Sequence, residues 1–167
     1  MEHSKGLSLR QNHLGILKLS NCENLETLPN SIGNLTCVRY LVVHNCPKLH
    51  KLSDSLRSMQ HCLEGLDVSG CNLMAGAIPD DLWRLFSLQW LNVSGNNIDC
   101  IPGGIICLPR LCTLTMNHCL KLKEIPELPS SLRQIEAHGC PLLETLSSDA
   151  KHPLWSSLPN CLPHIQV

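Results

Sequence analysis

Apolar residues recur along this chain in a block that fits neither an alternating strand nor a sustained helix. The clearest copy, residues 88–102 (LQWLNVSGNNIDCIP), places apolar side chains at Leu88, Leu91, Val93, Ile98 and Ile101. A short strand entering a tight turn explains this spacing, provided that Asn96 faces inward and satisfies backbone groups that the bend leaves unpaired. One such coil cannot bury its own apolar face, so the pattern predicts further copies.

Six copies are present, and they begin at Leu14, Val38, Leu63, Leu88, Leu111 and Leu132. Successive starts lie 24, 25, 25, 23 and 21 residues apart, which is the range of leucine-rich repeats. The turn position holds a cysteine or an asparagine every time: Cys22, Cys46, Cys71, Asn96, Cys119 and Cys140. The pattern predicts an α/β leucine-rich-repeat solenoid, a horseshoe with parallel strands on its concave face and short helical, 3₁₀ or extended returns on its convex face.

The repeats divide the chain into three parts. We expect a partial coil or a disordered segment over residues 1–13, six repeats over 14–146, and an irregular tail over 147–167. Residues 1–13 do not read as a full polar cap for the first repeat, so we expect the chain to belong to a longer array.

The return segments carry their own signals. Four contain an apolar pair three residues apart, the spacing of one helical or 3₁₀ turn: Ile32 and Leu35, Leu56 and Met59, Leu82 and Leu85, Ile105 and Leu108. Several begin with proline, which suits the first helical position. The proline-rich return at 126–131 should instead be extended, and Gly76 is a candidate start for a second, outer strand.

Cysteine usage and the N-terminus bear on the compartment. The sequence has 11 cysteines, and five of them occupy the inward turn position, where a reduced thiol acts as a small buried group and a weak donor. The first residues lack the apolar stretch of a secretory signal, and no apolar run of membrane-spanning length occurs. These features predict a cytoplasmic or nuclear protein. The sequons at Asn34 and Asn92 argue weakly the other way.

Charge and chemistry exclude several function classes. With 13 basic and 14 acidic residues and no long run of either sign, the chain is not expected to bind nucleic acid or a membrane. Histidine stands beside or near cysteine at His44, His61, His118 and His138. Structural zinc needs four converging ligands, whereas these cysteines face inward while His44 and His138 face outward. A buried neutral thiol is also inert, so we expect no metal, no cofactor and no catalytic site. Cys37 and Cys62 hold equivalent repeat positions and could be neighbours, with both thiols reduced.

The concave face is the predicted protein-binding surface. Strand side chains alternate, so the residues between the inward leucines point outward. The candidate binding residues are Lys18, Tyr40, Val42, His44, Asp67, Trp90, Asn92, Thr115, Asn117, Glu136 and His138. Tyr40 is the single tyrosine and Trp90 is one of three tryptophans in a chain with 3% aromatic residues. Outward aromatic residues among Asn, His and Ser resemble the composition of binding hot spots, although Trp90 could instead only cover its neighbours.

Three motifs carry a resemblance to a known family. They are the cysteine at the turn, L-P-x-S-I-G-N-L at 28–35, and E-L-P-S-S-L-R-x-I-E-A-H-G-C at 127–140. Together they resemble the leucine-rich-repeat region of plant intracellular disease-resistance receptors, of the class that carries a Toll/interleukin-receptor-type domain and a nucleotide-binding domain. The tail from Trp155 to Gln166 is similar to the segment that follows the repeats in such receptors. The sequence has no G-x-x-x-x-G-K-[ST] phosphate loop, so the nucleotide switch is not carried over.

The resemblance implies a non-catalytic recognition module of an innate-immunity receptor. Its partner would be a pathogen effector, a host protein or the receptor's own nucleotide-binding domain. Two alternatives stay open. An extracellular receptor ectodomain is favoured by the L-x-x-G-x-I-P pattern at 73–79 and by the two sequons, and a ubiquitin-ligase substrate receptor or bacterial ligase effector by P-E-L-P-S-S-L at 126–132. The ligase alternative needs an F-box or a catalytic cysteine domain, and we do not expect the 21 residues after the last repeat to hold either.

Overall fold

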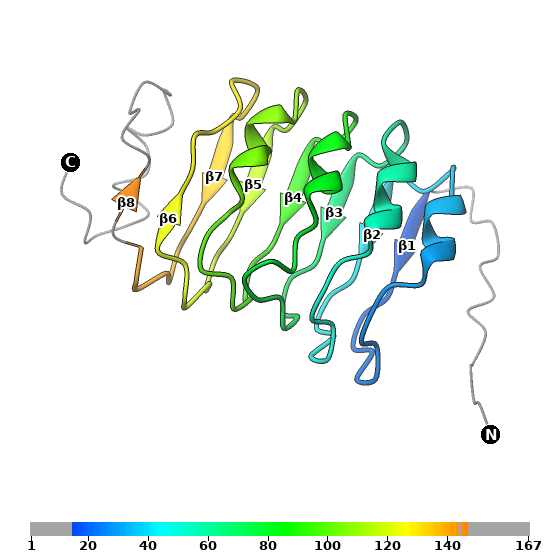
Figure 1. Cartoon of the computed structure of the whole chain (residues 1–167), viewed down its shortest axis with the longest axis horizontal. Helices are drawn as coiled ribbons and strands as arrows, with labels where there is room; N and C mark the ends of the chain where they lie inside the picture. The colour runs from blue at the N-terminus through cyan, green and yellow to red at the C-terminus, as the bar shows by residue number, and fades with distance from the viewer. Residues whose placement is uncertain (1–14, 144, 147–167) are drawn as a thin grey trace.

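The described part of the chain is a stack of coils built on one parallel sheet. A computed structural model describes residues 15–143 and 145–146, so the N-terminal segment 1–13 and the tail 147–167 lie outside the described residues. The sheet runs β1-β2-β3-β4-β5-β7 along the molecule, with every neighbouring pair parallel (Figure 1). Its strands are β1 (Ile16–Lys18), β2 (Tyr40–Val42), β3 (Gly65–Asp67), β4 (Trp90–Asn92), β5 (Thr113–Thr115) and β7 (Gln134–Glu136). The predicted solenoid is confirmed.

The strands align because their middle residues form one inward column. Leu41, Leu66, Leu91 and Leu114 are paired in register across β2 to β5 and are almost completely buried. Burying a leucine contributes roughly 2 kcal/mol, and a shift of one residue would turn the whole column to solvent. The repeat spacing therefore fixes the register, and the register in turn decides which side chains face outward.

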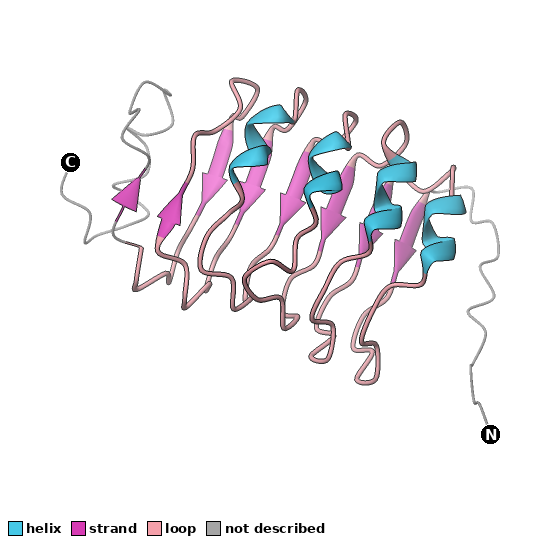
Figure 2. Ribbon diagram, in the orientation of Figure 1, coloured by secondary structure: helices cyan, strands magenta, loops and turns pink. Residues whose placement is uncertain are grey.

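Four of the returns form a layer of short 3₁₀ helices on the other side of the core (Figure 2). They are η1 (Asn30–Asn34), η2 (Asp54–Met59), η3 (Asp80–Arg84) and η4 (Gly103–Cys107). The predicted apolar pairs point into the core, as Leu56 and Met59 of η2 show. The prediction for proline was wrong by one position. Pro29, Pro79 and Pro102 precede their helices with extended backbone, and their carbonyl oxygens accept the first hydrogen bonds of the turn.

The C-terminal return is extended, as predicted. Residues 126–129 form no helix, and two short strands, β6 (Glu124–Ile125) and β8 (Thr145–Leu146), pair in parallel as a separate small sheet. The outer strand expected at Gly76 does not form within the described residues. Gly76 has a φ of 74° and sits in a turn, and the Ala77 carbonyl oxygen accepts a single hydrogen bond from the Leu52 N–H.

The turn after each main strand needs a left-handed residue. All six coils place a residue with positive φ directly before the turn position: Asn21, Asn45, Gly70, Gly95, His118 and Gly139. Glycine and asparagine tolerate this conformation, but other side chains are strained in it. The strain at His118 is therefore imposed by the fold, because the turn occurs at the same place in every coil.

The turn position itself ties each coil to the one before it. The thiols of Cys46, Cys71, Cys119 and Cys140 donate to carbonyl oxygens of the preceding coil, at Sγ–O distances of 3.2 to 3.4 Å. The acceptors are equivalent residues of successive coils: Leu19, Val43, Val93 and Met116. We call Cys46, Cys71, Asn96, Cys119 and Cys140 the turn ladder. Cys22 departs from it, because it is only half-buried and its thiol bonds the carbonyl of Ser20 in its own coil.

Asn96 fills the turn position with an amide side chain that both donates and accepts hydrogen bonds. Its Nδ2 donates to the carbonyl oxygens of Val68 and Val93 at 2.9 and 2.8 Å, and its Oδ1 accepts the N–H of Leu73 at 3.1 Å. The turns that begin at Cys46 and Cys119 are one residue longer than the turn from Cys71 to Leu73. In these longer turns, the N–H of the leucine that ends the turn donates to the carbonyl oxygen of the cysteine that begins it. The shorter turn before Leu73 leaves this N–H to an outside acceptor, and a side-chain amide can supply one while also donating.

Candidate protein-binding face

All eleven predicted binding residues lie on the sheet face opposite the buried leucine column. Each is the first or last residue of a strand or stands two residues beyond its end, and none is buried. The alternation argument therefore placed these side chains correctly. Their surroundings differ, however, and divide the face into three parts.

An aromatic step occupies the first part, on the central strands. Tyr40, Gly65 and Trp90 are paired in register on β2, β3 and β4. A Cβ atom added at Gly65 would lie 2.5 Å from Tyr40 Cδ1 and 3.1 Å from Trp90 Cε3. The two rings therefore lean over the glycine from opposite sides and cover it. Tyr40 still exposes 39% of its surface and Trp90 is half-buried, so the step stays open to a partner.

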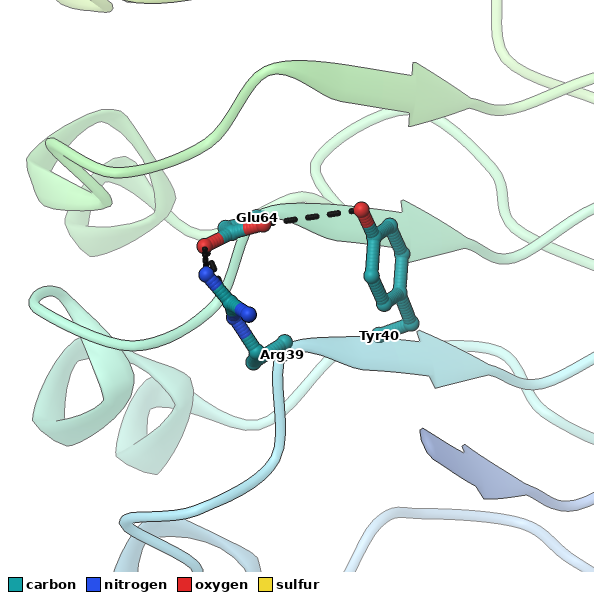
Figure 3. Close-up of polar contacts among 3 residues, drawn as sticks. All are labelled: Arg39, Tyr40 and Glu64. Atoms are coloured by element: carbon teal, nitrogen blue, oxygen red, sulfur yellow. Dashed lines mark hydrogen bonds and ion pairs between the residues drawn. The ribbon is translucent and has the colours of Figure 1, made fainter. Parts of the chain in front are cut away.

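An ion pair borders this aromatic step. Arg39 Nη2 lies 2.6 Å and Arg39 Nε 2.9 Å from Glu64 Oε1, and the Tyr40 hydroxyl lies 3.5 Å from Glu64 Oε2. Figure 3 shows the Glu64 carboxylate between the guanidinium group and the tyrosine hydroxyl. Neither Arg39 nor Glu64 was among the predicted binding residues. The available signal was opposite charges at the same repeat position 25 residues apart, which in-register stacking brings together.

The second part is the line of strand ends, where two predicted residues have structural partners. Asp67 Oδ1 accepts the N–H of Ser69 at 2.8 Å, and Asn92 Oδ1 accepts the N–H of Ser94 at 3.0 Å. Such bonds to the backbone two residues on are typical of Asp and Asn in turns. Only one oxygen of the Asp67 carboxylate is used in this way among the described residues. Its charge remains available on the face.

Beyond the strand ends lies His44, which was predicted to face outward. Its ring is exposed, and Nδ1 lies 2.8 Å from Ser69 Oγ on the next coil. Ser69 itself is buried, although the equivalent residues of the other coils are exposed or half-exposed. The His44–Ser69 contact links two coils and leaves the histidine ring accessible.

The third part, at the C-terminal strands, is a closed polar network. Asn117 Nδ2 donates to Glu136 Oε2 at 3.1 Å, and Asn117 Oδ1 accepts the N–H of His138 at 2.8 Å. Gln134 Nε2 donates to the other oxygen of Glu136 at 2.7 Å. These side chains satisfy one another, so a partner would have to replace existing hydrogen bonds in order to use them.

The inward thiols are protected from chemistry by their burial. Burial raises the pKa of the Cys71 and Cys119 thiols to about 11, and it also raises the pKa of Cys46 and Cys140. Their neighbours His44 and His138 are exposed on the other side of the backbone, so histidine and thiol do not converge. Within residues 15–143, no group of three or more His, Cys, Asp or Glu side chains is placed to hold a metal ion. The described helices are all too short or too polar to cross a bilayer.

Known proteins share both the repeats and the fold. The family model for the leucine-rich repeat matches residues 13–35, 62–85 and 87–108. Disease resistance protein RPS4 of Arabidopsis thaliana is 31% identical over 137 residues, which cover 80% of this chain and 10% of that protein. TMV resistance protein N of Nicotiana glutinosa is 30% identical over 143 residues, covering 71% of this chain and 12% of that protein.

Among solved structures, the leucine-rich-repeat domain of the type III effector XopL superposes with a TM-score of 0.62 at 21% identity, over 80% of this chain and 48% of that domain. This likeness concerns the fold alone. The chain spans about a tenth of the length of the curated relatives. The resemblance that the turn cysteines and the 127–140 motif indicated is thereby confirmed: the chain is a leucine-rich-repeat solenoid whose repeats are similar to those of plant disease-resistance proteins.

Proposed function

We propose that this chain is the protein-recognition part of a plant disease-resistance receptor and that it binds its partner through the concave sheet. The observation that carries the proposal is the aromatic step at Tyr40, Gly65 and Trp90, where an exposed tyrosine and a half-exposed tryptophan flank a glycine on the concave face. Rigid aromatic groups supply contact area at a low entropy cost, as in other protein-binding surfaces.

The partner would be a pathogen effector, a host protein or the nucleotide-binding domain of the same receptor. The role is non-catalytic, since the buried thiols have a raised pKa and the exposed histidines stand apart from them. In the full receptor, partner binding would be coupled to signal transduction. The present sequence has no G-x-x-x-x-G-K-[ST] phosphate loop, so the nucleotide switch is not assigned to it.

We also propose a reducing compartment, the cytoplasm or the nucleus. All ten cysteines among the described residues are free, and four of them act as thiol donors inside the core. Titration of thiols in the denatured protein, purified without reductant, should give eleven free groups. Fewer than eleven would favour the extracellular ectodomain instead.

Capture with face-selective variants tests the binding proposal. The chain would be used as bait in extracts of infected leaves, and each captured protein would be purified and its affinity measured. Tyr40→Ala/Trp90→Ala should weaken that affinity at least about tenfold, as expected for aromatic hot spots. The matched control is Phe86→Ala/Ile106→Ala, which removes two exposed apolar residues from the return side. Loss of binding in the control variant alone would move the site to the convex face.

A further inference from the structure

We propose that the aromatic step receives an arginine side chain of the protein partner, whose guanidinium group would stack on Trp90 and Tyr40 and pair with the carboxylates of Glu64 and Asp67. The inference rests on the proposed function and specifies the chemistry of its partner. It is carried by the aromatic residues and the charges on the three central strands.

The surface at Gly65 is flanked by two aromatic rings. Gly65 has no side chain, so β3 is low between two strands that carry rings, and both rings lean over it. Tyr40 and Trp90 thus border the same part of the concave face, above Gly65. A cation over the face of an aromatic ring is attracted by the ring quadrupole, and arginine is used more often than lysine.

Two carboxylates lie beside these rings. Glu64 directly precedes β3 and Asp67 ends it, so carboxylates stand at both ends of the strand below the rings. Arg39 contacts only Oε1 of Glu64. Among the described residues, the other oxygen, Oε2, has only the Tyr40 hydroxyl, at 3.5 Å, and Asp67 uses only Oδ1, for the N–H of Ser69. Two carboxylate oxygens therefore retain acceptor capacity beside the aromatic surface.

The same surface distinguishes a guanidinium group from an ammonium group. Figure 3 shows that this surface already binds one guanidinium group, that of Arg39, with the Glu64 carboxylate held between it and the tyrosine. A planar guanidinium can stack on a ring and donate along its edge at the same time, whereas an ammonium group is a compact and strongly hydrated point charge. The combination of flat rings and edge-on carboxylates therefore fits arginine better than lysine.

A peptide probe tests this inference without the natural partner. Acetyl-Gly-Gly-Arg-Gly-Gly-amide would be titrated into the ¹⁵N-labelled chain, and the indole N–H signal of Trp90 would be followed, with its assignment made from Trp90→Phe. The internal control is Trp83, which is buried against Gly104 on the return side. A saturable shift of the Trp90 signal, with Trp83 unmoved, is the expected result.

Two matched comparisons separate charge from shape. The same peptide with citrulline, a neutral analogue of arginine, should bind at least about threefold more weakly, and the lysine peptide should also be weaker. Glu64→Gln/Asp67→Asn retains oxygen acceptors, including one for the Ser69 N–H, yet should weaken the arginine peptide about fivefold. Glu23→Gln/Glu127→Gln removes two exposed charges elsewhere and should leave its affinity unchanged.

The inference is overturned by equal binding of the citrulline and arginine peptides, by tighter binding of the lysine peptide, or by the absence of a saturable Trp90 shift. Any of these results leaves the capture experiment intact, since that experiment reports concave-face binding of any chemistry. Conversely, capture that depends only on Phe86 and Ile106 would contradict the proposed function whatever the peptides do.

Discussion

The turn ladder and the aromatic step are built on the same coils but follow opposite rules. In the ladder, coil after coil repeats one solution, a small donor that reaches the equivalent carbonyl of the coil before it. In the aromatic step no position repeats, since tyrosine, glycine and tryptophan follow one another in a single column. The repetition reflects a backbone requirement that every coil shares. The departure from repetition shows that no shared backbone requirement fixes the residues of the aromatic step.

The C-terminal third of the concave face supports the same distinction. Its polar side chains are outward and varied, yet Asn117, Glu136 and His138 are joined to one another. Variation alone therefore does not identify a binding site. A candidate site also needs groups whose interactions are incomplete, and on this face they lie around Trp90 and Glu64.

The strongest way to break the ladder is to remove its amide. Asn96 is 2% exposed and bonds two carbonyl oxygens and the Leu73 N–H, so Asn96→Ala leaves several buried groups unpaired and should cost about 4 kcal/mol of unfolding free energy. Urea denaturation measures this. Asn97→Ala, which removes a single half-exposed bond to Asn72, should cost about 0.5 kcal/mol. Equal losses for the two variants would show that the ladder amide has no special role.

A second test uses pH. Burial raises the pKa of Cys71 and Cys119 from 9.0 to about 11, so the folded state holds these protons more tightly than the unfolded state does. Their contribution to stability is complete below pH 9 and is lost as the pH rises toward 11. Between pH 8 and pH 10 the loss should be about 1 kcal/mol for each thiol. Cys71→Ala/Cys119→Ala should lose less stability over the same interval; an identical decline would assign the effect to other groups.

Removing one thiol gives a smaller and more local effect. Cys119 is fully buried and its Sγ lies 3.4 Å from the Val93 carbonyl oxygen. Cys119→Ala should therefore lower the unfolding free energy by about 1.5 kcal/mol, from the lost packing contacts and the lost thiol hydrogen bond, while the Val93 carbonyl oxygen still accepts from Asn96 Nδ2. Cys112→Ala, at an exposed cysteine, should change it by less than about 0.5 kcal/mol. Thermal unfolding in the presence of reductant compares the two, and a larger effect at Cys112 would contradict the ladder.

The smallest expected stability change concerns the aromatic step. Gly65→Ala places a methyl group where the Tyr40 and Trp90 rings now lie, and both rings can swing toward solvent, so the cost should be only about 1 kcal/mol. The near-ultraviolet circular dichroism of the aromatic residues should nevertheless change. Gly103→Ala is the matched control, because a Cβ there meets nothing within 4 Å. An unchanged spectrum for Gly65→Ala would show that the rings do not cover the glycine.

Much of this architecture could be predicted from the sequence because a solenoid converts sequence spacing into spatial adjacency. Repeat starts gave the strand register, and the apolar pairs gave the four 3₁₀ turns. The outer strand predicted at Gly76 does not form among the described residues, since a single glycine permits a turn as readily as a strand. The proline positions were misplaced by one residue because an extended proline is equally compatible with the residue before the helix.

The candidate site was predictable only in part. Alternation placed Tyr40 and Trp90 outward, but the hydrogen bonds of Asp67 and Asn92 depend on strands being only three residues long, which the pattern does not specify. The Arg39–Glu64 pair lies just before the strands, outside the alternating positions. Which of the outward groups are already satisfied is a property of side-chain geometry, and the sequence does not carry it.

Hydroxyl-radical footprinting of the chain, with and without the partner obtained by capture, shows which face the partner covers. If the partner binds the concave sheet, Tyr40 and Trp90 should lose reactivity when it is bound, while Phe86 on the return side should keep its own. Protection of Phe86 together with full reactivity of Tyr40 and Trp90 would contradict binding through the concave sheet.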